Sequence, residues 1–337
     1  MRLPPTASLI VCLSIIWSVG SHAGETIRIA TFNCEILAAP RERVTISKYR
    51  FDTARYAQFE RIAAVIESIE PDIINLQEVT SKDSVDLLVK ILHEKGLTAY
   101  RGFHVDGHDN FMKIDVACIS KFEPDLIEGE SIRCIWSKDD ESGLREPFTF
   151  ARDDESIGSG TTSLDRNALY FFTIGKTKLG ILGLHLKSNP DDNYSNARRT
   201  AEAEIARRII SQEIVARGYT PIVMGDLNDY DPDIPDRDES RDTKTDVIRN
   251  LKNYDPKTDG DELINVAVKI TRQQDRYTSW WDRNENGADD YYDVKTMLDH
   301  ILLHKSLWPG VKRVLIDHSQ SLETSDHFPV VVDLELP

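Results

Sequence analysis

Short hydrophobic runs and longer amphipathic stretches alternate along most of the chain. Runs rich in Ile, Val, Leu or Phe are typical of buried β-strands, and they lie at residues 26–33, 72–79, 114–120, 132–136, 169–174, 179–186, 221–225, 297–303 and 328–334. Apolar residues at helical spacing predict helices at 53–68 and 195–216. Strand–helix–strand units come first and closely spaced strands follow, so the pattern predicts an α/β fold with mixed sheets.

Two polar, acidic stretches interrupt this pattern, at residues 137–163 and 229–260. Charged runs without hydrophobic periodicity are typical of solvated surface loops. We therefore predict that both stretches are surface insertions within one domain rather than linkers between domains.

The first 23 residues differ in character from the rest of the chain. Arg2 is their only formally charged side chain, residues 9–19 are mostly apolar, and small residues stand at Ser21 and Ala23. This is the pattern of a cleaved signal peptide, because the apolar run is shorter than the ~20 residues of a spanning helix. We expect a periplasmic or secreted protein made of one domain, residues 24–337, without a transmembrane segment after signal removal. An uncleaved N-terminal anchor is the alternative.

Composition excludes several classes of protein. The 337 residues are 40% hydrophobic and carry a net charge of −16, which fits an ordinary globular protein and excludes a disordered, fibrous or polytopic membrane chain. A basic nucleic-acid footprint is absent, so a polyanionic partner must be held by something else, such as a metal ion. The mature chain keeps Cys34, Cys118 and Cys134. We expect buried thiols, with a Cys118–Cys134 bridge as the alternative.

Polar and ionisable side chains stand where several predicted strands end, which is where active-site groups collect in layered α/β folds. The set consists of Asn33, Glu35, Glu78, His185, Asp226, Asn228, Asp299, Asp326 and His327. Any one of them is readily explained as a cap or a turn residue. The whole set is not readily explained in this way. Asp299 lies between Leu298 and Ile301 in a hydrophobic strand, and burying its carboxylate without a partner would cost several kcal/mol.

The chemistry of these side chains points to phosphate esters. Carboxylate and amide oxygens are ligands suited to Mg²⁺ or Mn²⁺. Two histidines without further nitrogen ligands suit a different task, which is to stabilise charge or pass a proton beside a phosphoryl oxygen. Together they indicate metal-assisted phosphate-ester hydrolysis, in which Asp226 activates the attacking water.

Six short blocks now resemble, in order, the signature blocks of the endonuclease/exonuclease/phosphatase superfamily. They read TFNCE from residue 31, LQEV from 76, HLKS from 185, GDLN from 225, LDHIL from 298 and SDHFPV from 325. The resemblance spans residues 26–335, nearly all of the mature chain. It implies a four-layer α/β sandwich, in which two mixed β-sheets pack face to face with helices outside.

The resemblance also implies a role for each matched residue. Glu78 is similar to the principal metal ligand, with Asn33, Glu35 and Asp326 around it. The catalytic set implied by the blocks comprises His185, Asp226, Asn228, Asp299 and His327. In it Asp226 activates water and is positioned by Asn228, while His327 contacts phosphate and pairs with Asp299. His185 resembles the catalytic histidine of the deoxyribonuclease and sphingomyelinase branches. Arg166 is similar to a phosphate-contacting arginine of secreted deoxyribonucleases.

A second candidate metal site lies at residues 282–293. This segment places oxygen-bearing side chains at loop positions 1, 3, 5, 9 and 12, with Gly287 at position 6, as in an EF-hand-type calcium loop. The five residues are Asp282, Asn284, Asn286, Asp290 and Asp293. A structural Ca²⁺ site and a plain Asx-rich turn are the two alternatives.

Three functions fit the sequence. An exported, metal-dependent nuclease acting on DNA or RNA is favoured by His185, Arg166 and the signal peptide. A lipid-headgroup or small-molecule phosphodiesterase or phosphatase is favoured by the net charge of −16, which would repel a long polyanion. A non-catalytic binder is disfavoured because no matched catalytic position is lost. We expect a monomer whose partner is nucleic acid, with a phospholipid or small phosphate ester as the alternative.

Overall fold

The computed structural model describes residues 25–44, 51–241, 245–258 and 260–337. The predicted signal peptide therefore lies outside the described residues. Within the described part of the chain, every helix is too short or too polar to cross a lipid bilayer.

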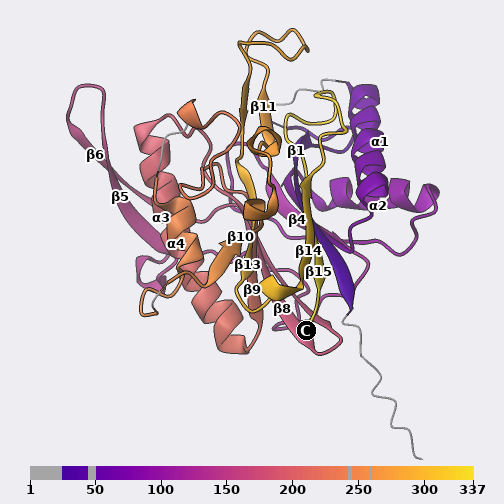
Figure 1. Cartoon of the computed structure of the whole chain (residues 1–337), viewed down its shortest axis with the longest axis horizontal. Helices are drawn as coiled ribbons and strands as arrows, with labels where there is room; N and C mark the ends of the chain where they lie inside the picture. The colour runs from indigo at the N-terminus through magenta and orange to yellow at the C-terminus, as the bar shows by residue number, and fades with distance from the viewer. Residues whose placement is uncertain (1–24, 45–50, 242–244, 259) are drawn as a thin grey trace, which may run out of the picture.

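Two mixed β-sheets form the centre of the molecule (Figure 1). The first has the strand order β14-β15-β1-β2-β4-β3, built from β1 (Thr26–Leu37), β2 (Ile73–Val79), β3 (Arg101–His104), β4 (Asp115–Ser120), β14 (Val311–Ile316) and β15 (Val330–Glu335). The second has the order β10-β13-β9-β8-β7, built from β7 (Asn167–Ile174), β8 (Thr177–His185), β9 (Thr220–Asp226), β10 (Leu263–Asn265) and β13 (Asp299–His304). The pairs β1–β2 and β8–β9 are parallel, and the other pairs in these two sheets are antiparallel.

Helices cover the outer face of each sheet, as Figure 1 shows. In the first sheet these are α1 (Asp52–Ile69) and α2 (Lys82–Glu94), and in the second they are α3 (Asn193–Ile209) and α4 (Val247–Lys252). Helix α1 follows from its sequence, because Phe59, Ile62, Ala63 and Ile66 recur at helical spacing and all are buried. The predicted four-layer α/β sandwich is confirmed.

Several shorter elements complete the chain. Helix α3 continues as a π-helical turn (Ile210–Ile214) and a 3-10 turn (Val215–Arg217). Further 3-10 turns are Asp140–Ser142, Glu239–Arg241, Val266–Lys269, Gln273–Asp275 and Trp308–Gly310. Two hairpins stand outside the main sheets, formed by β5 (Arg145–Ala151) with β6 (Ile157–Ser163) and by β11 (Ser279–Trp281) with β12 (Val294–Thr296).

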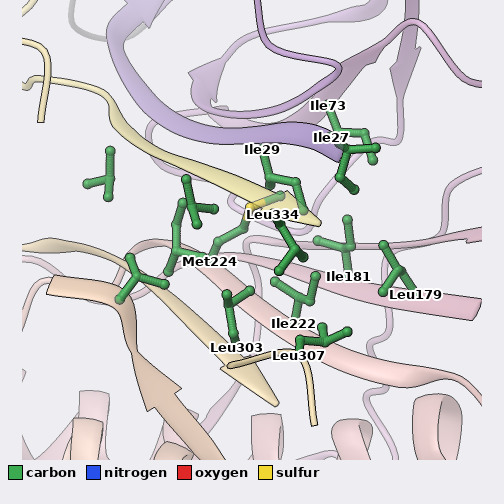
Figure 2. Close-up of a cluster of buried hydrophobic side chains, with 14 of the residues drawn as sticks. Ile27, Ile29, Ile73, Leu179, Ile181, Ile222, Met224, Leu303, Leu307 and Leu334 are labelled. Atoms are coloured by element: carbon green, nitrogen blue, oxygen red, sulfur yellow. The ribbon is translucent and has the colours of Figure 1, made fainter. Parts of the chain in front are cut away.

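The inner faces of the two sheets bury one hydrophobic layer, in which Ile29 of β1 faces Ile181, Ile222 and Leu303 of the second sheet (Figure 2). Alternate residues of the same strands, such as Phe32, pack under the helices instead. Towards one end of the layer the inward positions become polar. On β9 the inward sequence is Ile222, Met224 and then Asp226, so the alternation that builds the core also delivers a carboxylate to its end.

The predicted strand at 132–136 is wrong. Only Arg133 forms a bridge, exchanging backbone hydrogen bonds with Leu169. Two residues further along, the side chain of Asn167 bonds both the N–H and the carbonyl of Ile135, at 3.0 and 3.1 Å. A side-chain amide therefore replaces the next step of the strand ladder, and the segment does not continue as a strand.

The two polar stretches are more ordered than predicted. Residues 137–163 contain the β5–β6 hairpin, which projects from the α3 side of the molecule in Figure 1 and packs Phe148 and Phe150 against Tyr194. Residues 229–260 contain α4 and the buried carboxylates of Asp229 and Asp231. Of the cysteines, Cys34 and Cys118 are buried and Cys134 is partly buried, and all three are free thiols. The alternative Cys118–Cys134 bridge is not formed.

Candidate active site

Three neighbouring strands place three of the predicted residues in a row. His185 at the end of β8 pairs with Asp226 at the end of β9, and Asp226 pairs with Asp299 at the start of β13. All three side chains are buried. Residues paired across strands lie on the same face of a sheet, so their side chains share one edge of the inner layer.

The first sheet supplies the facing side chains. Asn33 of β1 donates hydrogen bonds to Asp226 Oδ2 at 3.0 Å and to Glu78 Oε1 of β2 at 3.2 Å, which connects the two sheets. His185 Nε2 lies 3.6 Å from Asp226 Oδ2 and 3.7 Å from Glu78 Oε1. His327 Nε2 approaches the same oxygen of Asp226 to 4.0 Å. Segments from both ends of the chain therefore converge at one point.

His327 is held by a buried carboxylate. Its Nδ1 lies 2.7 Å from Asp299 Oδ2, and Thr278 Oγ1 accepts the backbone N–H groups of Leu298 and Asp299. Burial favours the neutral imidazole, but the carboxylates of Asp299 and Asp226 outweigh it and raise the pKa of His327 well above its ordinary value. The arrangement presents a charged imidazolium whose Nε2 faces the cluster.

Burial and neighbouring negative charge make the carboxylates basic. Removal from water, and then the charge of Asp299, raise the pKa of Asp226 to about 7. The backbone N–H of Asn228 donates to Asp226 Oδ1 at 3.0 Å, while the Asn228 amide is fixed on the carbonyl of Leu186 at 3.2 Å. Asp226 is therefore oriented by Asn228 and poised to accept a proton near neutral pH.

Two candidate metal ligands and the residue that orients Asp226 have strained backbone. Glu35, Glu78 and Asn228 have left-handed φ values of 50°, 61° and 50°, and the β1–β2 and β2–β4 pairings shift register around the first two. Such conformations are unfavourable for side-chain-bearing residues and concentrate at functional sites. Here the bulges turn the glutamates toward the gap between the sheets, and the N–H of Ile36 holds Glu78 Oε2 at 3.0 Å.

The oxygens around Glu78 fit a divalent cation. Burial, and then the charge of Asp326, raise the pKa of Glu78, which shows two carboxylates crowded together. Glu35 Oε2 accepts the backbone N–H of Asp326 at 3.1 Å, and Asn33 Oδ1 accepts the N–H of Glu35 at 3.0 Å. A depression of about 560 Å³ includes Glu35 and Asp326 in its lining. An all-oxygen set of repelling carboxylates is the chemistry that Mg²⁺ or Mn²⁺ neutralises.

A second cleft, of about 450 Å³, opens beside Glu78 and His185 and carries three cationic side chains. Arg166 donates to the carbonyl of Leu186 at 3.0 Å, and its Nη1 lies 3.4 and 3.5 Å from the two ring nitrogens of His185. Burial, and then the charge of Arg166, lower the pKa of His185 well below its ordinary value, so this imidazole is neutral. Arg198 is neutralised by Asp165 and Glu202. We name this space the cationic cleft.

Sequence reasoning missed two functional features here. Lys187 lines the cationic cleft, and its place inside the HLKS block was the available signal. Arg199 of α3 and Asp229 form a fully buried ion pair of 2.7 Å. Arg199 also donates to the Lys187 carbonyl at 2.8 Å, so it ties the segment after β8 to the segment after β9. No local pattern marks this pair, because its members are 30 residues apart.

The candidate calcium loop lies between β11 and β12 and borders the depression at Glu35 and Asp326, because Asp282, Glu285 and Gly287 also line that depression. In the described structure the side-chain amides of Asn284 and Asn286 both donate to Asp290 Oδ2, at 2.9 and 2.8 Å, and Asp282 accepts the N–H of Gly287 at 2.6 Å. Asp293 accepts the indole N–H of Trp280 at 2.8 Å. These are the hydrogen bonds of an Asx-rich turn, and Ca²⁺ binding here stays a prediction.

The fold and the site together define the class of the protein. Two face-to-face mixed sheets that join carboxylates, an amide and two histidines at one edge are the framework of the phosphoric ester hydrolases that the blocks resemble. The sequence model of the Endonuclease/Exonuclease/phosphatase family matches residues 30–327, and the chain belongs to that family. No curated protein sequence matches the chain.

Solved structures share the fold at low identity. An endonuclease/exonuclease/phosphatase family protein from Leptotrichia buccalis C-1013-b aligns with a TM-score of 0.56 and 16% identity, over 92% of this chain and 100% of that one. An AP endonuclease from Archaeoglobus fulgidus aligns with a TM-score of 0.58, 16% identity and coverages of 92% and 100%. D. rerio TDP2 complexed with a single-strand DNA product aligns with a TM-score of 0.53 and 16% identity, over 92% of this chain and 99% of that one.

Proposed function

We propose that this protein is an exported, divalent-metal-dependent phosphodiesterase that hydrolyses DNA or RNA. The observation that carries the proposal is the convergence of Glu78, His185, Asp226 and His327 from both sheets on one point. The adjoining cationic cleft, with Arg166 and Lys187, suits the flanking phosphates of a polymer. Family membership, and the processing of nucleic acid by similar folds, support the same choice.

The residues divide the reaction among them. Asp226 accepts a proton from water, whose oxygen attacks phosphorus opposite the leaving oxygen, so one P–O bond forms as the other breaks. His327, kept charged by Asp299, donates a hydrogen bond to a phosphoryl oxygen as negative charge develops there. His185 is neutral and sits between Arg166 and the carboxylates, where it orients the phosphate through its ring N–H.

The cation belongs with Glu78, Glu35, Asp326 and Asn33. When bound, it withdraws negative charge from the phosphoryl and leaving-group oxygens. Mg²⁺ and Mn²⁺ are the proposed ions because the ligands are oxygens.

A second candidate is hydrolysis of a lipid headgroup or small phosphate ester. The observations that favour it are the net charge of −16 and the exposed rings of Trp281 and Tyr291 near the site. These rings suit an interfacial substrate as well as a nucleotide.

A substrate panel under chelator, Mg²⁺, Mn²⁺ and Ca²⁺ tests the proposal. Its members are duplex DNA, single-stranded DNA, RNA, sphingomyelin vesicles and a chromogenic phosphodiester. We expect metal-dependent cleavage of at least one nucleic acid, abolished by chelator. Turnover of sphingomyelin without cleavage of any nucleic acid would replace the nuclease by the second candidate, and no turnover on any ester would contradict both.

Export rests on the N-terminal sequence pattern and has its own test. Expression of the full chain in a bacterial host, followed by fractionation and mass spectrometry of the N-terminus, should give a mature protein that begins at Gly24 outside the cytoplasm. A full-length cytoplasmic product would contradict it.

A further inference from the structure

A cavity of about 660 Å³ adjoins the cationic cleft along the segment that follows β8. The segment at 187–191 separates the two, because Lys187 and Ser188 line the cationic cleft while Asn189 and Asp191 line this cavity. Four aromatic residues contribute to its wall, Tyr230, Trp281, Tyr291 and Tyr292. We name it the aromatic cavity.

Three of the four rings of the aromatic cavity are open to solvent, and the fourth, Tyr230, is buried. Tyr291, Tyr292 and Trp281 are 87%, 61% and 54% exposed, and all three lie on the β11–β12 hairpin and its loop, which projects from the top of the molecule in Figure 1. Large aromatic surfaces are ordinarily buried, so three exposed rings around one hollow indicate a binding surface. One cation accompanies them, since the Arg283 guanidinium lies 5.0 Å from the centre of the Trp281 ring.

The walls of the aromatic cavity continue into the catalytic centre. Ser279, on one wall, forms a β-bridge with His327, and the next residue, Trp280, donates its backbone N–H to the Asp326 carbonyl at 2.8 Å. Leu298, on another wall, immediately precedes Asp299 and accepts the N–H of Leu227 at 2.9 Å. The aromatic cavity therefore borders the backbone segments that carry Asp299, Asp326 and His327.

We propose that the aromatic cavity is a subsite for an unpaired nucleobase next to the scissile phosphate, so that the substrate is single-stranded or frayed nucleic acid. This rests on the proposed nuclease function. Stacking suits exposed aromatic rings and tolerates any base, because every base has a π-face. The placement of one arginine among the rings fits a ligand that alternates planar bases with phosphates. A quaternary ammonium headgroup fits less well, because Arg283 already covers the Trp281 ring with positive charge.

The test compares Trp281→Ala and the double variant Tyr291→Ala/Tyr292→Ala with wild type. The matched control is Phe51→Ala, which removes an aromatic ring of 73% exposure from the start of α1. The substrates are a labelled single-stranded oligonucleotide and the same strand carrying tetrahydrofuran abasic residues around the cleavage site. We expect wild type to show a KM at least tenfold lower for the strand with bases, and both cavity variants to lose this preference. The double variant, whose rings are not part of the lining of the depression at Glu35 and Asp326, should keep its kcat on the abasic strand. The Phe51 variant should behave as wild type.

Binding without turnover separates this proposal from the nuclease proposal. In chelator, titration with the base-containing strand should quench tryptophan fluorescence in wild type, and Trp281→Ala should abolish the quenching. Loss of quenching in a protein that cleaves no nucleic acid would sustain the base subsite while the nuclease proposal fails. Cleavage of nucleic acid with unchanged KM in both cavity variants would overturn the base subsite alone. Loss of sphingomyelin turnover in the cavity variants, without any effect on the strands, would assign the cavity to a lipid headgroup and also overturn it.

Discussion

The cationic cleft and the aromatic cavity meet at residues 187–191 but differ in the side chains that they offer to a ligand. The cleft offers Arg166 and Lys187 on the ordered ends of β7 and β8, close to the buried His185. The cavity offers uncharged rings on a projecting hairpin, with 87% of Tyr291 exposed. Under the two proposals, positive charge attracts and positions phosphate on one side, while stacking holds the neighbouring base on the other.

The largest expected effect comes from the centre that both regions share. Asp226→Asn and His327→Ala should each lower kcat by about 10²–10⁴-fold or more on every substrate, because each removes a proton acceptor or donor at the phosphoryl group. Steady-state kinetics with circular dichroism as a fold check measures this. His304→Ala, at the outer end of β13, is the matched control. Near-full turnover by either centre variant would refute the assigned roles.

The next effect tests the segment that separates the two regions. Arg199→Met should lower the free energy of unfolding by about 3–5 kcal/mol, because it leaves Asp229 charged and buried without its partner. Kinetics on protein that remains folded should show weaker substrate binding by both the cationic cleft and the aromatic cavity, since Arg199 anchors the Lys187 carbonyl between them.

Two further variants make the stability measurement specific. The double variant Arg199→Met/Asp229→Leu should recover part of the loss, because it removes both charges. Lys82→Met, in an exposed pair with Asp86, should change the free energy of unfolding by less than about 1 kcal/mol. Equal losses from Lys82→Met and Arg199→Met in chemical denaturation would show that the buried pair has no special weight.

Salt dependence distinguishes the two regions directly. Arg166→Ala and Lys187→Ala should each raise KM about tenfold at low salt and reduce the slope of log KM against log salt by about 0.7–0.9, as expected when one phosphate contact is lost. Trp281→Ala should leave that slope unchanged. Lys176→Ala, in the exposed turn at the opposite end of β8, is the control. Equal slopes in all variants would remove the electrostatic distinction between cleft and cavity.

The smallest effect concerns the tip of the hairpin. Asp290→Ala removes the acceptor shared by Asn284 and Asn286. We expect less than a threefold change in KM, because these exposed hydrogen bonds contribute little to the stability of the hairpin that carries the rings of the cavity. Melting curves with and without Ca²⁺ complete the test. A Ca²⁺-dependent rise in Tm in wild type that Asp290→Ala abolishes would establish the calcium loop, whereas equal curves would leave the Asx-rich turn.

Much of the fold, and the edge at which the candidate catalytic residues of β8 and β9 meet, could be predicted because the information is local. The two-residue alternation of β9 places Ile222, Met224 and Asp226 on one face, and the same logic holds for His185 on β8. The same kind of pattern is present in α2, where Val85, Leu88 and Leu92 recur at helical spacing, although this helix is not among those predicted from the sequence. A segment with a regular hydrophobic period can therefore be assigned to a strand or a helix without knowledge of the segments that pack against it.

The remainder depends on contacts between distant segments. The strand predicted at 132–136 fails because Asn167, 32 residues away from Ile135, takes over its backbone hydrogen bonds. The aromatic cavity joins residues 189–191 to Tyr230, to the β11–β12 hairpin and to Leu298, so no short window of sequence contains it. The same holds for Arg199 and Asp229. Patterns of hydrophobicity report which face is buried, and they do not report which loops meet.

The pairing of β8, β9 and β13 has a consequence for folding fidelity. Displacing β9 by a single residue relative to its neighbours would turn Asp226 toward α3 and leave Val223 facing the gap between the sheets. A charged carboxylate beneath a helix is strongly unfavourable, so the misaligned chain would not close into a stable sandwich. The proposed catalytic groups thus also disfavour wrong alignments of the strands that carry them, and a molecule that completes its fold has already positioned these side chains.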